Sequence, residues 1–246
     1  NIDGTFYNNL ALAFSAEKQW QGGKHSLSMT AFVSPVQRGQ QGNSYREVYE
    51  LTDNYLYNPN WGYQNGKKRN AKVVTAFDPT AVISHIWKID DTTTLTTGVG
   101  AHYARYGNTA LNWYNAPDPR PDYYRYLPSY FEDEDMQMQY RDLWRSGRPD
   151  FTQINWDNLY LANANNLRAG NGAAVYMVEE RRSDLLETSF NSTLNKQFNR
   201  HLGLTAGVGA RFTQSRQFKT VDDLLGSNYV LDICLLYTSP SPRDTR

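Results

Sequence analysis

Apolar and polar residues alternate along six segments of this chain, and this alternation restricts its possible folds more than any other feature. In residues 202–212, leucine, alanine, valine and phenylalanine occupy every second position, with glycine, threonine and arginine between them. Successive side chains of a β-strand point to opposite faces of a sheet, so this period of two predicts a strand with one apolar face. Five further segments of this kind predict six strands in all; they are residues 10–16, 27–33, 80–89, 93–106 and 186–194.

The connections between these segments are alternately short and long. Polar turns near Gln21, Asp90 and Asn199 join the segments into three antiparallel hairpins, whereas residues 33–77 and 106–184 separate one hairpin from the next. Loops longer than about 12–15 residues are uncommon in compact domains. Short turns on one rim and long loops on the other are typical of outer-membrane β-barrels.

Composition favours a membrane barrel over a soluble β-sandwich, which the alternation alone also allows. The chain is 39% hydrophobic and 14% aromatic, with a mean hydropathy of -0.70, and it contains no apolar run long enough for a spanning helix. The face opposite the apolar one is small and polar, as in a barrel lumen, and Trp20, Trp87 and Phe198 flank the short turns as an aromatic girdle would. We therefore predict an all-β, antiparallel transmembrane barrel fragment with long, partly helical extracellular loops.

The long loops carry helix signals and a distinctive aromatic segment. Three possible capping boxes occur at Ser44/Glu47, Ser129/Glu132 and Asp150/Gln153, and the second predicts a helix over residues 130–145. Prolines stiffen residues 112–130, whose exposed rings could bind a ligand at low entropic cost or could bury one another instead. The candidate ligand-binding residues are Trp113, Tyr114, Tyr123, Tyr124 and Tyr126.

Other chemistry finds little support in the sequence. With 25 basic and 25 acidic residues the chain has no charge excess for binding nucleic acid. The four histidines are scattered, and the acidic residues 132–135 suit a helix N-terminus better than a calcium loop. We expect no catalytic residue, no metal site and no cofactor, and predict that the chain is not an enzyme. The alternative is a soluble secreted β-domain that binds or cleaves carbohydrate.

The last residues of the chain differ in character from the rest. Residues 234–246, which include the only cysteine, Cys234, resemble a translated sequencing adapter. We treat them as an artefactual tail and residues 1–233 as one partial barrel domain. The N-terminus has no initiator methionine and no apolar leader, so the chain is expected to begin within a longer protein.

Several long stretches resemble the early barrel of TonB-dependent receptors, in particular those with a carboxypeptidase-regulatory-like N-terminal domain and a plug. These stretches are residues 28–39 (SMTAFVSPVQRG), 57–67 (YNPNWGYQNGK), 113–130 and 219–226 (KTVDDLLG). The resemblance covers nearly all of residues 1–233. It implies a plugged barrel of many more than six strands, located in the outer membrane of a Gram-negative bacterium.

The resemblance also implies the function and the partners. Such a receptor takes up a ligand by active transport that TonB energises, through a plug and a TonB box that this sequence lacks. Its expected partners are outer-membrane lipid, TonB, an imported ligand and a surface lipoprotein. The family imports chelated iron, cobalamin, glycans or peptides, and nothing in these residues selects one of them.

Overall fold

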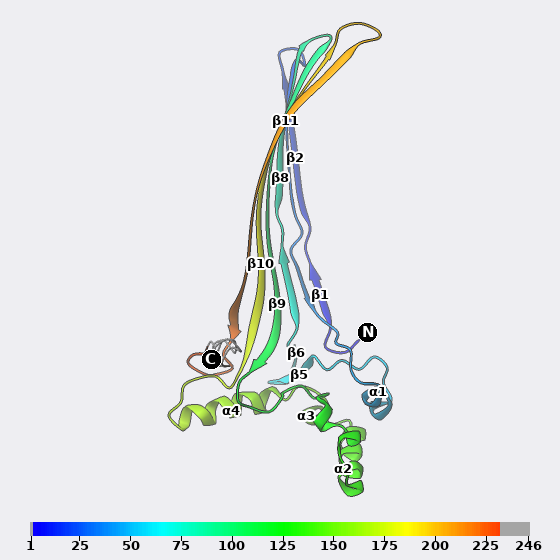
Figure 1. The fold of residues 1–246 in the computed structure, drawn as a ribbon, viewed down its shortest axis with the longest axis vertical. Helices are drawn as coiled ribbons and strands as arrows, with labels where there is room; N and C mark the ends of the chain where they lie inside the picture. Colours follow the sequence, from blue (N-terminus) through cyan, green and yellow to red (C-terminus); the bar gives the residue numbers. More distant parts are fainter. Residues whose placement is uncertain (1, 232–246) are drawn as a thin grey trace, which may run out of the picture.

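The computed structural model describes residues 2–231, so the predicted artefactual tail, residues 234–246, lies outside the described part. Strands make up 50% and helices 18% of the described residues, and a nine-stranded antiparallel sheet dominates them. The sheet is long and twisted, with hairpin turns at one end and helical loops at the other (Figure 1). It is not closed into a barrel.

The strands of this sheet differ greatly in length. The longest, β10, has 22 residues and would span roughly 70 Å at ~3.3 Å per residue. The nine strands are β1 (Phe6–Asn9), β2 (Leu12–Trp20), β3 (His25–Val33), β4 (Val36–Gly39), β7 (Val73–Phe77), β8 (Thr80–Asp90), β9 (Thr93–Trp113), β10 (Tyr176–Gln197) and β11 (Gly203–Asp223).

Six of these strands are halves of three longer ones. The pairing of β1 with β4 continues that of β2 with β3 without an inserted residue, from Phe6 opposite Gly39 to Trp20 opposite His25. In the same way β7 and β8 pair with β9 in one register up to Lys88, after which the register shifts before Asp90. The interruptions lie at Pro35 and Pro79, which have no N–H to donate to the ladder. The six predicted strands are therefore confirmed, with additional length at the loop end.

The three predicted hairpins are also confirmed. Their turns follow Trp20, Asp90 and Gln197, and all three lie at the same end of the sheet (Figure 1). Gln21 adopts a positive φ of 53° and is followed by two glycines, as a tight polar turn requires. The open edges are formed by β1 with β2 and by β11.

The long connections fold into a cap at the other end of the sheet. A separate two-stranded sheet joins the helical segments there. The elements of the cap are α1 (Arg46–Thr52), β5 (Trp61–Gln64), β6 (Lys67–Asn70), η1 (Tyr124–Tyr126), η2 (Pro128–Tyr130), α2 (Glu134–Arg145), α3 (Pro149–Thr152) and α4 (Trp156–Arg168).

The predicted capping boxes are wrong. Ser44 donates its hydroxyl to Asp122 over 2.9 Å, and Glu47 accepts a 3.0 Å hydrogen bond from the backbone N–H of Ser129. Both predicted N-cap serines therefore bond across the cap instead of along their own helices. Helix α2 begins at Glu134, four residues later than predicted, because Asp133 accepts the Met136 N–H over 2.9 Å. The third box is absent too, since Arg148 precedes α3 and makes no side-chain cap.

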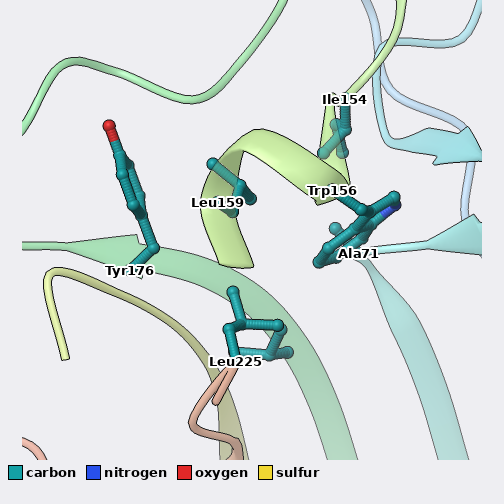
Figure 2. Close-up of a cluster of buried hydrophobic side chains, with 7 residues drawn as sticks. Ala71, Ile154, Trp156, Leu159, Tyr176 and Leu225 are labelled. Atoms are coloured by element: carbon teal, nitrogen blue, oxygen red, sulfur yellow. The ribbon is translucent and has the colours of Figure 1, made fainter. Parts of the chain in front are cut away.

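The buried core lies in the cap rather than along the sheet. The larger cluster packs the start of α4 against the start of β10 and the segment that follows β11 (Figure 2), and its buried members are Ala71, Ile154, Trp156, Leu159, Tyr176, Val178 and Leu225. A second cluster joins α1 to α2 and consists of Val48, Tyr57, Leu127 and Trp144. The long loops are consequently a packed structure, whereas most of the sheet has no covering layer.

Candidate functional site

One face of the sheet carries a mainly apolar surface, which we call the apolar band; it is interrupted by a row that contains His85, Thr97 and Ser192. Directly paired residues of antiparallel strands lie on the same face, so each row can be followed across the sheet. One row contains Met29, Ile83, Val99, Phe190 and Ala210 in that order. The pattern that predicted separate strands thus produces one apolar surface across all of them.

The apolar band has the height expected of a membrane-spanning strand. On β9 it extends from Leu95 to Tyr103, nine residues, within the roughly 9–11 that a tilted strand needs to cross a bilayer. Its side chains are solvent-exposed in this chain; Phe14 is 59% and Val208 63% exposed. Nothing among residues 2–231 packs over this surface as a second sheet, since the other sheet is the hairpin β5–β6 in the cap.

The opposite face of the same strands is polar and small. The row next to the one described above contains Ser28, Ser84, Gly98, Asn191 and Gly209. A Cβ atom added at Gly100 would lie 2.8 Å from the Ser189 hydroxyl, so this face is crowded where glycine occurs. Such a face suits contact with water or with a polar filling.

An aromatic cluster borders the apolar band at the short-turn end. The Trp20 ring stacks on His25 at a centroid distance of 5.2 Å, and His25 stacks on Trp87 at 5.5 Å. His85 joins the stack through a 3.1 Å hydrogen bond between its Nε2 and His25 Nδ1. The predicted girdle residues Trp20 and Trp87 therefore lie together. The sequence prediction that the histidines are scattered is wrong for His25 and His85, because the β3–β8 register juxtaposes these strands.

Three of the predicted ligand-binding tyrosines form one cluster. The Tyr123 ring lies 4.7 Å from Tyr124 and 5.5 Å from Tyr126, both in edge-on arrangements. The Tyr126 hydroxyl donates to the Asp118 carbonyl over 2.9 Å, and Trp144 Nε1 donates to the Tyr126 carbonyl over 2.9 Å. Tyr124 remains 42% exposed, so this cluster combines internal packing with an accessible ring.

The other two predicted residues, Trp113 and Tyr114, line one cavity that is separate from the tyrosine cluster. The Arg120 guanidinium lies 5.6 Å from the Trp113 ring and 6.0 Å from the Tyr123 ring, which links Trp113 to the tyrosine cluster. Trp113 and Tyr114 both line a cavity of about 450 Å³, together with Met177 and Lys219. The five residues therefore do not surround a single cavity.

A smaller polar cavity of about 290 Å³ was not predicted from the sequence. Its lining residues come from two distant loop segments and are Asn43, Ser44, Tyr45, Arg120, Asp122 and Tyr123. Burial raises the pKa of the Asp122 carboxyl, against the opposing effects of the Ser44 hydroxyl and the Arg120 charge. The alternation of prolines with Arg120 and Asp122 was visible in the sequence, but residues 43–45 reach this site only through the packing of the cap.

Replacing Asp122 with asparagine should alter how the stability of the cap depends on pH. A carboxyl whose pKa is raised by folding stabilises the folded state at low pH, and this contribution is lost as pH rises through the folded pKa. Asparagine keeps the acceptor for Ser44 but cannot ionise, so D122N should be the more stable protein at pH 7. Hydrogen exchange of α1 and η1 from pH 4 to 7 measures this, with the exposed Glu50→Gln as control. If cap stability depends on pH in D122N as it does in the parent chain, Asp122 is not the group responsible for that dependence.

Comparison with known proteins adds no identification. No protein-family model matches the chain, and no curated protein and no solved structure is detectably similar to it. Among residues 2–231, no group of three or more His, Cys, Asp or Glu side chains is placed to hold a metal ion. No helix in that range is both long enough and apolar enough to cross a membrane. The function must therefore be inferred from the apolar band and the cap.

Proposed function

We propose that this chain forms part of the wall and the extracellular loops of an outer-membrane receptor of the TonB-dependent type, which imports a ligand. The apolar band contacts lipid, the polar face lines the lumen, and the cap forms the outer surface around the ligand entrance. Four parts of this proposal rest on the sequence resemblance alone: the energy from TonB, the plug, a partner lipoprotein and the imported ligand.

The observation that supports the proposal is the exposed apolar band itself. Soluble monomers rarely expose contiguous apolar patches larger than a few hundred Å². Here apolar residues recur in register on every long strand, including Leu12 on β2 and Phe212 on β11, which are 58% and 59% exposed. Lipid would cover this surface without a second protein layer. A secreted β-sandwich would need a second large sheet over the same face.

The two ends of the apolar band support an orientation in which the cap lies on the outer side of the membrane. Trp20 and Trp87 lie at the short-turn end, where barrel proteins place interfacial aromatic residues. The other end leads into the packed cap, as the long extracellular loops of such barrels do. In this orientation the short turns lie on the periplasmic side.

The proposal predicts that the chain requires a lipid-like environment. Both sheet edges present unpaired backbone groups, and the apolar band would face water, so the chain should aggregate in buffer alone. Light scattering and circular dichroism after dilution from urea measure this, with and without detergent micelles. We expect monodisperse β-structure with detergent only. A monodisperse preparation that unfolds cooperatively without detergent would contradict the membrane assignment and support the secreted domain.

A further inference from the structure

A row of charged residues borders the apolar band at its cap end. Arg105 on β9 pairs with Asp184 on β10, which in turn pairs with Arg216 on β11. This row follows directly after the row of Tyr103 and Leu186 and lies on the same face. The transition from apolar to charged side chains therefore occurs within a single step along the strands.

The two arginines of this row have no acidic partner. Asp184 is occupied by Arg182, whose Nη2 lies 2.8 Å from Asp184 Oδ1. Among the residues that the structure describes, neither Arg105 nor Arg216 forms an ion pair or a side-chain hydrogen bond, and both are exposed. Two strand spacings, about 9–10 Å, separate their backbones. Arg182 also lies 3.4 Å from Glu180 Oε2, so the three arginines and two carboxylates of this region leave one net positive charge beside the apolar surface.

The position and chemistry of these groups suit lipid phosphates. A long arginine side chain can keep its aliphatic part against the apolar band while its guanidinium reaches the headgroup layer. The planar guanidinium also matches phosphate oxygens with two parallel hydrogen bonds. Asp184 opposes this only in part, because Arg182 forms ion pairs with Asp184 and Glu180 and the group still keeps one net positive charge.

We propose that Arg105 and Arg216 bind the phosphate groups of anionic lipid headgroups at the cap-side edge of the apolar band. This inference rests on the proposed membrane function and adds to it a residue-specific lipid contact. The contact would hold the chain at one depth in the leaflet, with the band below the headgroups and the cap above them.

Vesicle binding of the full chain tests this proposal. The chain would be diluted from urea onto phosphatidylcholine vesicles with and without phosphatidylglycerol, and co-flotation would be measured. An arginine near an anionic surface contributes about fivefold in affinity, so R105Q/R216Q should reduce the preference for anionic vesicles by roughly 30-fold. Binding to neutral vesicles should stay unchanged. The matched control is R211Q, on β11 but on the opposite face, beside Glu187.

The outcomes separate the two proposals. If the parent chain fails to bind neutral vesicles, the membrane function is wrong and the lipid contact falls with it. If binding to neutral vesicles is intact but R105Q/R216Q keeps the full anionic preference, or R211Q loses it equally, only the lipid contact is wrong. Loss of the preference in millimolar inorganic phosphate, at constant ionic strength, would identify a site for free phosphate instead and would also overturn the proposal.

Discussion

Replacing Val208 with arginine is expected to destabilise the membrane-inserted state by about 2–4 kcal/mol, the cost of a cation on the lipid face at mid-bilayer. Val208 lies in the apolar band on β11, between Ala206 and Ala210 and one row from the central row of Val99, and is 63% exposed. Its paired residue on β10 is Ser192, which offers no carboxylate to the new charge. Equilibrium unfolding from detergent micelles or vesicles, followed by circular dichroism, measures the change.

The matched control for Val208→Arg is Gly209→Arg, one residue along the strand and on the opposite face. A Cβ at Gly209 would meet no atom closer than 3.6 Å, whereas one at Gly207 would lie 3.1 Å from the Thr193 hydroxyl. Gly209 therefore tests the choice of face with little added crowding. G209R should insert nearly as well as the parent. If G209R is the more damaging substitution, the apolar band does not face lipid.

Replacing Trp156 with alanine should destabilise the cap by about 3–5 kcal/mol, as expected for truncating a fully buried tryptophan. Trp156 is 0% exposed at the first turn of α4, in the larger core cluster (Figure 2). Its Nε1 donates to the Arg69 carbonyl over 3.3 Å, and the Arg69 guanidinium lies 4.2 Å above its ring. One substitution therefore removes the packing and the polar contacts that hold α4 on the β5–β6 hairpin.

The effect of Trp156→Ala should be confined to the cap, because the apolar band makes no part of its cluster. Limited proteolysis should cleave residues 149–175 faster, while the strand signal in circular dichroism remains. Leu161→Ala, on the same helix but 52% exposed, should change the cleavage rate little. Equal sensitivity of the two variants would show that α4 is not anchored through Trp156.

The local parts of the fold followed from the sequence. Alternation with a period of two identified the six long strands, because side-chain direction in a strand depends only on position along the chain. Short polar turns identified the hairpins for a similar reason. Helix α4 was missed, since its asparagine-rich sequence has little intrinsic preference for a helix. Contacts with other segments stabilise it, since Asn163 on α4 donates to the Tyr176 and Leu225 carbonyls over 2.8 and 3.1 Å.

The candidate sites depended on contacts that no local pattern encodes. Ser44 and Glu47 were predicted to cap one helix, but hydrogen bonds to residues about eighty positions away replace that cap. The His25–His85 pair and the Arg105–Asp184–Arg216 row exist only because the strand registers bring these residues together.

The sequence by itself therefore determined which residues form strands, which face of each strand is apolar, and which end of the sheet carries the turns. Only the tertiary structure decided how these faces join into one band and which loop residues share a cavity. The physical reason is that alternation sets side-chain direction within a strand, whereas register and loop packing depend on partners distant in the chain. The predicted ligand-binding residues illustrate the difference, since Trp113 and Tyr114 line one cavity whereas Tyr123 lines another.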